Sequence, residues 1–573
     1  MTGVKHQKWW GWGVEGVAFR HDDKPRMAPF VMDKIGLDLS APGNPPPSFD
    51  DIEVPPSRLD DELAAELRDA VGDKHLVVDD FDRVVHTYGK GLMDLVKVRA
   101  GILPRVPDVV VYPGDEAQLR AVVDAVVAAD AVLIPFGGGS NISGSLTPRP
   151  DEQRQVVSLD MGRLNRVLDV DERAGLARVQ AGVLGPDLEE QLQERGWTAG
   201  HQPDSFRHST LGGWIATRSS GMQSDKYGDI ADIVRGMRVV QPGRVMSLRP
   251  LPATSSGPSV REMILGSEGR LGVISEAWIH VHRIPENREI IAYLFPTWGA
   301  ALKAMHEISI SDASPSVTRV SDANETAFSF STQKASRGVK GAVQSALFET
   351  LRRRGWDLDK VCLSYVGYEG GAARVRAEKS IVGKIVRAQG GIKLGKGPGA
   401  LYDQKKFDTP YIRDFLLDIG ALADVSETAA PWSELMNVYT HTMREARRAF
   451  DDLGAPGFIM CHLSHSYHSG ACLYFTFALV PNASDPQGQL DQYWHVKSAV
   501  QQSFVDTAGT ISHHHGVGTD HAPWLEEDIS PAGTQTMVAL LRGVDPGANL
   551  NPGTILPAER EWRAADSTAG AGG

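Results

Sequence analysis

The chain has 573 residues, of which 42% are hydrophobic and 23% are charged, an ordinary globular composition. A net charge of −13 argues against nucleic-acid binding through a broad basic field. Three cysteines occur without any CxxC spacing, which argues against a disulfide framework and fits a reducing compartment. They are Cys362, Cys461 and Cys472.

Targeting and membrane signals are weak along the whole sequence. The N-terminus has no charged segment followed by an apolar one, so no secretory signal is predicted. The most apolar helical stretch, residues 121–135, is interrupted by Asp124 and Asp130 and is too short and polar to span a bilayer. The expected location is the cytoplasm, with peripheral contact at the inner face of the membrane as an open alternative.

Residues 1–99 are expected to form an N-terminal helical region that packs on the outside of the molecule. Three tryptophans beside glycines, in Trp9–Gly13, indicate an aromatic anchor against a neighbouring domain. Leucines and a valine at a four-residue step from Leu59 to Val71 predict a helix.

Residues 100–285 alternate strands with helices, which predicts an α/β or α+β domain. Asp115 and Glu116 open the first helix of this segment, which runs to Val127, and their charge suits the positive end of the helix dipole. Strands are expected over residues 107–113, 131–135, 156–160 and 177–181, with a second helix over 188–195.

Residues 286–500 repeat a strand-then-helix pattern without glycine-rich phosphate loops, which favours a ferredoxin-like sheet that caps the cofactor domain. Strands are expected at 290–295, 361–368 and 471–479, and the helices that follow them at 299–309, 372–388 and 488–507.

Residues 501–573 form a C-terminal segment that is expected to complete the active site. The turn-rich stretch Asn549–Gly553 is expected to end against the cofactor domain. The small-residue tail Ser567–Gly573 is expected to be disordered.

The run Pro135-Phe136-Gly137-Gly138-Gly139-Ser140-Asn141 directly follows an expected strand. Three residues without a Cβ atom let successive backbone N–H groups converge on an anion such as a pyrophosphate. The run is neither GxGxxG nor a Walker loop, so it disfavours NAD-type Rossmann binding and P-loop hydrolysis. Taken alone, it is equally well explained by a simple turn.

Two further blocks have a similar character. Residues 203–221 are rich in hydroxyls and glycines, which is natural for a chain wrapped around a polar ligand. Residues 266–274, Gly-Ser-Glu-Gly-Arg-Leu-Gly-Val-Ile, form another glycine-spaced turn that leads into a strand.

Three successive imidazoles lie in the run Ser512–Gly518, which reads SHHHGVG. Imidazole titrates near neutral pH, so this cluster indicates proton transfer or metal ligation. A solvated histidine-rich loop is the plain alternative. Because the triplet itself contains no cysteine or carboxylate, we favour proton chemistry.

In their order and spacing, the three blocks resemble the FAD-binding domain of the vanillyl-alcohol-oxidase-type flavoproteins, the PCMH-type FAD-binding fold. Within that superfamily, further motifs resemble the alkyl-dihydroxyacetonephosphate synthases, which form the ether bond of ether lipids. The resemblance covers nearly the whole chain. These motifs are Trp9-Trp10-Gly11-Trp12-Gly13, Tyr411-Ile412-Arg413-Asp414, Ser426-Glu427-Thr428 with Pro431-Trp432, Gly470-Ala471-Cys472-Leu473-Tyr474-Phe475, and SHHHGVG.

The resemblance implies an α+β fold with such an FAD-binding domain, a ferredoxin-like cap domain and extra helices at both ends. It also implies non-covalent FAD, since the glycine loop holds no histidine or cysteine for attachment. The implied cofactor-binding residues are Pro135, Phe136, Gly137, Gly138, Gly139, Ser140, Asn141, Pro203, Asp204, Ser205, Phe206, Arg207, His208, Ser209, Ala216, Thr217, Arg218, Ser219, Glu268, Gly269, Arg270, Leu271, Gly272, Val273 and Ile274.

The implied activity is a transferase reaction without net redox. Flavin N5 would attack C1 of acyl-dihydroxyacetone phosphate, and the fatty acid would be exchanged for a long-chain alcohol. By resemblance, Arg413 binds the phosphate, Tyr474 is an acid–base group, and Arg319 lies near the active site. His513, His514 and His515 match the family's essential histidines.

Structural explanations remain open for each of these residues. Arg413 could be a solvated surface charge, Tyr474 a packed core residue, and His513 a structural histidine. His462, His465 and His468 form a second cluster, at a place where flavin-dependent 2-hydroxy-acid dehydrogenases hold a metal. Because the matching carboxylate is missing, we interpret these three as pocket-lining or surface residues and expect no metal.

The alternative function is an FAD-dependent D-2-hydroxy-acid dehydrogenase or oxidase, and a flavin-binding protein without turnover ranks third. The expected ligands are lipid substrates, acyl-dihydroxyacetone phosphate and a fatty alcohol. No nucleic-acid partner is expected, and the protein is expected to form a homodimer. The sequence departs from the better-known synthases at Thr519-Asp520-His521, where they carry a basic residue, and it has no C-terminal SKL address.

Overall fold

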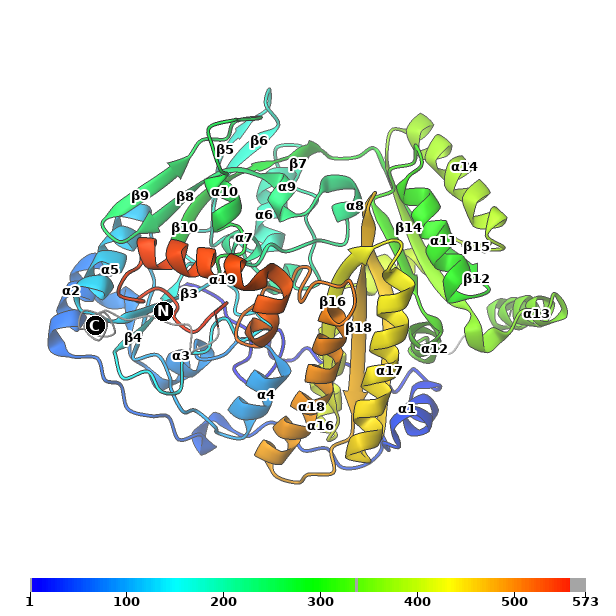
Figure 1. Ribbon diagram of the computed structural model, residues 1–573, viewed down its shortest axis with the longest axis horizontal. Coiled ribbons are helices and arrows are strands. Elements are labelled where there is room, and N and C mark those ends of the chain that lie inside the picture. The colour runs from blue at the N-terminus through cyan, green and yellow to red at the C-terminus, as the bar shows by residue number, and fades with distance from the viewer. Residues whose placement is uncertain (1–2, 335–338, 557–573) are drawn as a thin grey trace.

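The computed structural model describes residues 3–334 and 339–556, and the predicted disordered tail lies outside them. There are three main sheets; the two from the first half of the chain lie together toward one end of the long axis, and the third lies toward the other end (Figure 1). The expected α+β class is confirmed. The boundaries at residues 99/100, 285/286 and 500/501 remain predictions.

The first sheet has four strands in the order β1-β2-β4-β3, of which β2, β4 and β3 run parallel. Its valine-rich strands are buried on both faces, as parallel strands usually are. Helices α2 and α5 pack together on it. The bounds are α2 (Asp61–Val71), β1 (Leu76–Val77), β2 (Val109–Val111), α5 (Glu116–Ala128), β3 (Val132–Phe136) and β4 (Val156–Asp160).

The second sheet is antiparallel, with five strands in the order β5-β6-β10-β8-β9. A short two-stranded ribbon, β11-β7, lies beside it. The strands are β5 (Val167–Asp171), β6 (Leu176–Gln180), β7 (Trp197–Thr198), β8 (Val234–Gln241), β9 (Arg244–Leu248), β10 (Val273–His280) and β11 (His282–Arg283).

The third sheet has seven strands in the order β15-β12-β14-β13-β17-β18-β16. Its first four strands follow the β-α-β-β-α-β connectivity of a ferredoxin-like unit, as expected. The remaining three extend the same sheet by antiparallel pairing. The strands are β12 (Asn287–Phe295), β13 (Val317–Ser321), β14 (Cys362–Gly370), β15 (Ile392–Gly395), β16 (Leu422–Pro431), β17 (Gly457–Ser466) and β18 (Gly470–Leu479).

Helices on the third sheet build the largest apolar core, in which α11, α14, α17 and α18 bury their apolar stripes. The helices of this half are α11 (Trp298–Ser309), α12 (Ala323–Ser331), α13 (Val339–Arg353), α14 (Ala372–Ala388), α15 (Lys396–Lys405), α16 (Pro410–Asp418), α17 (Leu435–Leu453) and α18 (Pro486–Val505). The other helices are α1 (Met27–Ile35), α3 (Asp80–Val85), α4 (Leu92–Arg99), α6 (Gly185–Gln193), α7 (Leu211–Thr217), α8 (Ser224–Tyr227), α9 (Ile230–Ile233), α10 (Val260–Ile264) and α19 (Leu525–Val544).

The C-terminal segment returns to the first sheet, as predicted. Leu550 forms a parallel bridge with Leu133 of β3, and the backbone N–H of Asn551 donates to the carbonyl of Leu133 at 2.8 Å. In Figure 1, α19 crosses the first half of the molecule.

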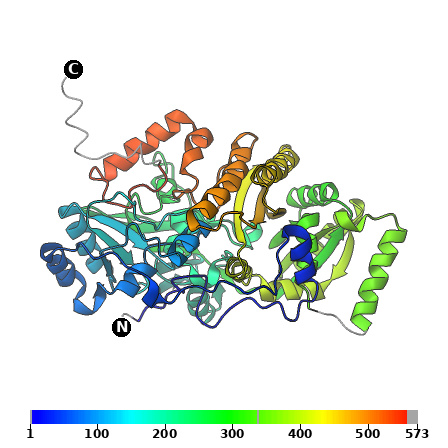
Figure 2. The same ribbon diagram turned by 90° about the horizontal axis from the view of Figure 1, so that it is seen from below.

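The N-terminal segment connects both halves. Gln7 donates to the carbonyl of Gly138 at 2.8 Å, whereas α1 packs against α12 and β17 of the third sheet. Figure 2 shows this segment running beneath the molecule from one half to the other. The expectation of a region on the outside of the molecule does not hold for the whole N-terminal segment, because Trp12, residues 17–20 and Met27 line the large cavity between the two halves.

Among the helices of the described residues, none has both the length and the apolar character needed to cross a membrane.

Candidate active site

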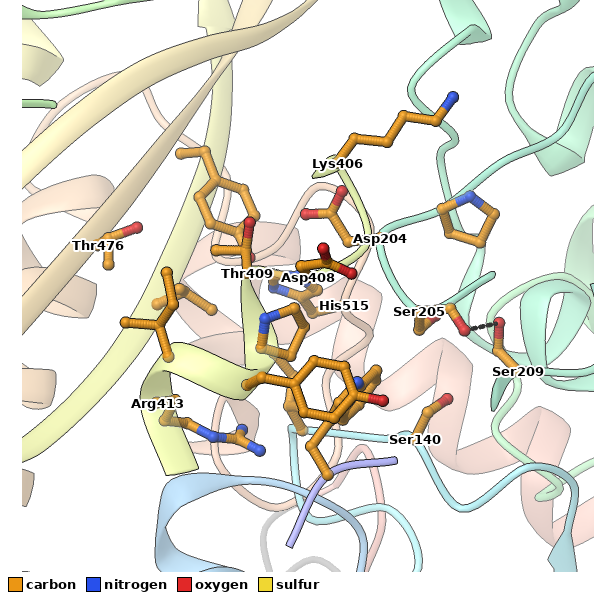
Figure 3. Close-up of a pocket in the computed structure, with 18 of the residues that line it drawn as sticks. Ser140, Asp204, Ser205, Ser209, Lys406, Asp408, Thr409, Arg413, Thr476 and His515 are labelled. Carbon is orange, nitrogen blue, oxygen red and sulfur yellow. Dashed lines mark hydrogen bonds between the residues drawn. The ribbon is translucent and has the colours of Figure 1, made fainter. Parts of the chain in front are cut away.

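A cavity of about 1520 Å³ lies between the two halves of the molecule. Figure 3 shows side chains from both halves facing it, with Ser140, Ser205 and Ser209 on one side and Arg413 and Thr476 on the other. This volume exceeds the roughly 300–1,000 Å³ of a typical single-ligand pocket. The cavity is therefore large enough for a cofactor together with a second ligand.

The glycine loop after β3 fits its neighbours only because it lacks side chains. A Cβ atom on Gly138 would lie 1.8 Å from the carbonyl oxygen of His208, and one on Gly137 would lie 2.4 Å from the hydroxyl of Thr210. Gly139 has a φ of +66°, in the left-handed region that favours glycine. The loop thus packs directly against the segment that begins at Pro203, and both line the cavity.

Most of the predicted cofactor-binding residues line this one cavity. Those that do are Pro135, Phe136, Gly137, Gly138, Gly139, Ser140, Asn141, Pro203, Asp204, Ser205, Ser209, Ala216, Thr217, Ser219, Glu268, Gly269, Gly272, Val273 and Ile274. They come from three blocks that are far apart in the sequence, and the fold brings these blocks together around one cavity.

Six predicted cofactor-binding residues do not line the cavity. Phe206 stacks on Trp214, Arg207 pairs with Asp408 at 3.6 Å, and Arg218 pairs with Glu262 at 3.2 Å. His208 faces Trp12 edge to face, Arg270 donates to the carbonyl of Thr554 at 3.0 Å, and Leu271 is core. Arg207 and Arg218 are thus in surface ion pairs, and the other four pack or bond away from the cavity.

A row of functional side chains crosses the third sheet. Glu427 on β16, Tyr474 on β18 and His462 on β17 lie directly opposite one another in the strand register. Directly opposed residues in antiparallel strands share a face, so all three point to the cavity side. The ring of Tyr474 stacks on that of His462, with centroids 4.8 Å apart.

A β-bulge decides where the second histidine cluster points. His462 and His465 are three residues apart, so a regular strand would place them on opposite faces. The register shifts between Leu463 and His465, which lets His465 pair with Cys472 on the same face as Tyr474. His465 and His462 both border a small cavity of about 30 Å³ next to the large one, whereas His468 is exposed.

The three successive histidines are held by one buried carboxylate. Glu427 accepts hydrogen bonds from the backbone N–H groups of His513, His514 and His515, at 2.5, 3.0 and 3.0 Å. It also accepts one from the hydroxyl of Ser512 at 2.9 Å. Burial alone would raise the pKa of Glu427, but His514 beside it and the N–H donors hold that pKa well below its usual range.

His514 and His515 line the cavity, but His513 lies behind them. Burial lowers the pKa of His514 to about 3 and that of His515 to about 4, so both rings are neutral near pH 7 and able to accept a proton. Burial also raises the pKa of Tyr474 well above its usual value, so its hydroxyl remains protonated. The site thus brings a proton donor and proton acceptors to one wall.

Arg319 lies on β13 beside the same row. Its guanidinium donates to Glu325 at 2.7 Å and lies 3.1 Å from Nδ1 of His462. Burial alone would raise the pKa of Glu325, but the charges of His462 and Arg319 beside it lower that pKa to about 2, so the arginine faces an ionised carboxylate. Arg319 therefore lines the cavity while paired with Glu325, and its role in the reaction stays a prediction.

Arg413, on α16, is largely buried, and its guanidinium is incompletely hydrogen-bonded. Its Nη1 donates to the carbonyl of Lys90, but Nε and Nη2 are buried without a hydrogen-bond partner, although Nη2 lies 3.5 Å from Oδ1 of Asp414 in an ion pair. A buried charged donor without a partner is costly, so these two nitrogens suit an anionic ligand group. The interpretation of Arg413 as a solvated surface charge is wrong, since its side chain is 13% exposed.

One end of the cavity has a large apolar surface, although Arg20, Asp23, Lys24 and Lys34 of the same N-terminal segment also line the cavity. Phe30 of α1 contacts Phe328 and Phe458, with ring centroids 6.0 and 5.6 Å apart. Val17, Phe19 and Met27 extend this lining.

Several site residues were not predicted. Glu427 lies in the Ser426-Glu427-Thr428 motif, and its one signal is a charged residue within a strand rich in small residues. Apart from Trp12, which belongs to the Trp9–Gly13 motif, the cavity-lining residues of the N-terminal segment carry no local signal for a site, and neither does Asn551.

Two groups of metal-ligand-type atoms occur among the described residues, and neither is the His462, His465 and His468 trio. One group is His6, His86 and Asp160, and the other is Glu427, Cys472, His513 and His514. In the second group, burial raises the pKa of Cys472 well above its usual value, which disfavours the thiolate that binds metals.

Comparisons with known proteins agree with this geometry. Residues 107–247 match the family model described as FAD binding domain, and residues 284–555 match the C-terminal domain of FAD linked oxidases. The glycine cradle and the wide cavity fit such a cofactor. The wall formed by Pro135–Asn141, Pro203–Ser205 and Glu268–Gly269 would hold it.

Two relatives are named alkyldihydroxyacetonephosphate synthase. The one from Dictyostelium discoideum is 36% identical over 97% of this chain and 94% of its own length. The one from Trypanosoma brucei brucei is 34% identical over 96% of this chain and 92% of its own length. A solved structure of an alkyldihydroxyacetonephosphate synthase is 34% identical, covers 96% of this chain and 98% of that chain, and superposes with a TM-score of 0.83.

Replacing Gly138 by alanine is expected to abolish FAD binding, because the new methyl group would push the glycine loop off the His208 backbone. Flavin absorbance per protein after gel filtration measures the effect. Gly543→Ala is the matched control, since a Cβ atom there meets nothing within 4 Å. Full flavin content in Gly138→Ala would show that the loop does not shape the cofactor site.

Proposed function

The chain belongs to the family of alkyldihydroxyacetonephosphate synthases, and from this premise we propose how its cavity carries out the family's reaction. The protein is an FAD-dependent transferase that makes the ether bond of ether lipids. The C1–O bond of acyl-dihydroxyacetone phosphate to the fatty acid breaks, and a C1–O bond to a long-chain alcohol forms. The alcohol proton balances the released carboxylate, and the reaction has no net redox change. The bound flavin supplies a nucleophilic ring nitrogen.

The incompletely satisfied guanidinium of Arg413 is the observation that carries this proposal. A phosphate ester offers several oxygens to two parallel N–H donors, which is the pairing that a guanidinium fork prefers. Lys90, whose carbonyl accepts from Arg413, adds a buried ammonium group near it. Burial lowers the pKa of Lys90 to about 8, although Asp414 opposes this shift, so the group stays largely charged at neutral pH.

Proton transfers fall to the wall built by Tyr474 and the histidine loop. Exchange at C1 requires a base for a C1 proton, and the released fatty acid and the incoming alcohol require an acid–base partner. The neutral imidazoles of His514 and His515 suit the first task, and the protonated hydroxyl of Tyr474 suits the second. Arg319 would place positive charge near the enolic oxygen that develops next to C1.

The apolar end of the cavity would take the acyl and alkyl chains, since burying methylene groups against Phe30, Phe328 and Phe458 is favourable. A lipid substrate has to leave a bilayer, and this supports peripheral contact with the inner face of the cytoplasmic membrane. A homodimer is proposed by resemblance to the family alone. Sedimentation velocity and flotation with lipid vesicles test these two points.

The function is tested by incubating the purified protein with palmitoyl-dihydroxyacetone phosphate and radiolabelled hexadecanol. We expect the label to enter an alkali-stable ether lipid, with release of palmitate and without consumption of oxygen. Flavin-stripped protein is the control. Absence of ether product, together with flavin reduction by a D-2-hydroxy acid, would contradict the proposal and favour the hydroxy-acid dehydrogenase.

Replacing Arg413 by lysine keeps the charge but removes the fork. We expect KM for the phosphate ester to rise roughly 10- to 100-fold, the effect of losing one charged hydrogen bond of about 1.5–3 kcal/mol. The flavin spectrum should not change. Arg283→Lys, at an exposed surface pair with Glu172, is the matched control. A KM unchanged from the unmodified protein would remove Arg413 from phosphate binding.

A further inference from the structure

We propose that Asp229, Tyr467 and His513 form a hydrogen-bonded chain that fixes the tautomer of His514 and leaves its Nε2 lone pair free for the cavity. In this arrangement His514 is the base of the site, and the other three are positioning residues. The inference rests on the proposed function, because it selects one histidine among the three for the proton at C1.

The hydrogen-bonded chain from Asp229 to His514 is continuous and its bonds are short. The hydroxyl of Tyr467, which follows β17, donates to Oδ2 of Asp229 at 2.7 Å. Nε2 of His513 lies 2.6 Å from the same hydroxyl. Nδ1 of His513 then lies 2.9 Å from Nδ1 of His514. Three segments that are far apart in the sequence thus meet behind the cavity lining formed by Tyr474, His514 and His515.

The carboxylate gives the chain its direction. Burial alone would raise the pKa of Asp229, but the neighbouring imidazoles of His465 and His513, together with the hydroxyls of Ser220 and Tyr467, lower the pKa to about 2, so the carboxylate is ionised and only accepts. Tyr467 must then donate to Asp229 and accept from Nε2–H of His513. A neutral His513 has its lone pair on Nδ1 and accepts from Nδ1–H of His514. The remaining lone pair of His514 is therefore on Nε2.

This lone pair has access to the reaction space. His514 lines both the large cavity and the small adjoining one, and its ring stacks on Tyr474 with centroids 5.9 Å apart. Within residues 3–334 and 339–556, the hydrogen bonds of His514 involve its Nδ1 and its backbone N–H, and none involves Nε2. The tautomer thus presents an acceptor where the substrate binds.

The hydrogen-bonded chain also counteracts the low basicity of His514. A buried imidazole is a weak base, because burial opposes the charge that protonation creates. An ionised carboxylate at the end of a hydrogen-bonded chain stabilises that charge, as the buried acid does in catalytic triads. Asp229 is free for this task, whereas Glu427 already accepts four hydrogen bonds from the loop.

Other titratable groups face the histidine pair from each neighbouring element. They are Glu427 of β16, His465 of β17, Cys472 and Tyr474 of β18, and His515 of the same loop. Of these, only Glu427 carries a negative charge near pH 7, and it lies 3.8 Å from Nδ1 of His514, beyond hydrogen-bond distance.

The first test is independent of turnover. Ring-¹⁵N-labelled histidine in the FAD-bound full chain reports the protonation of each nitrogen, with His513→Gln and His514→Gln used for assignment. We expect Nδ1–H with a bare Nε2 for His514, and Nε2–H for His513. In Tyr467→Phe this pattern should become a mixture of tautomers. The opposite tautomers in the unmodified protein, or an unchanged pattern in Tyr467→Phe, would overturn the inference.

The second test uses ether synthesis. Tyr467→Phe removes one hydroxyl and is expected to lower kcat about 100-fold, the lower end of the effect of losing acid–base assistance. KM and the flavin spectrum should stay unchanged. Because the carboxylate is uncoupled, the imidazole loses basicity, so the acid limb of the kcat profile should move to lower pH. Asp229→Asn should give the same loss, and the double variant should add little to it.

Tyr439→Phe is the matched control, since Tyr439 donates a comparable hydrogen bond to Asp322 at 3.1 Å and, in the described part of the chain, makes no ring contact or hydrogen bond with His513 or His514. Its kcat and acid limb should match those of the unmodified protein. A loss of kcat in Tyr467→Phe without a moved acid limb would indicate a merely structural tyrosine and overturn the inference. Failure of the unmodified protein to make an ether lipid would instead refute the proposed function, and the histidine spectra would still decide the tautomer.

Discussion

Two buried carboxylates hold the histidine loop, and the rest of the site depends on this constraint. Glu427, from the third sheet, accepts the N–H groups of His513, His514 and His515. Glu268, from the turn before β10, accepts those of Val517 and Gly518 at 2.6 and 3.0 Å. Since buried carboxylates are costly without such donors, the loop and the two halves of the molecule stabilise one another.

The glycines of the loop follow from the same constraint. A Cβ atom on Gly516 would lie 2.8 Å from the carboxylate of Glu268, and one on Gly518 would lie 1.8 Å from the carbonyl of Ser143. Both have positive φ, at +86° and +56°. The backbone therefore approaches the cofactor wall closely on one side while the imidazoles face Tyr474 on the other.

Sequence reasoning predicted the parts of this structure that depend on local pattern. Buried valine runs such as Val109–Val111 and the glycine loop after β3 lie where expected, because strand burial and missing side chains leave a local signature. The faces of His462 and His465 could not be predicted, since a bulge sets them. His513 lies behind His514 and His515 rather than in the cavity lining, and much of the N-terminal segment contacts the cavity. Both features depend on long-range packing, which a short sequence motif does not predict.

The central claim is that the Glu427 carboxylate orders the histidine loop. Glu427→Gln keeps the shape but turns one acceptor oxygen into an N–H donor that faces other donors. Amide hydrogen exchange of the FAD-bound protein, resolved at His513, His514 and His515, measures the effect. We predict markedly faster exchange at these three amides in Glu427→Gln, with β3 and β4 unchanged. Exchange at the three amides as slow as in the unmodified protein would contradict the account.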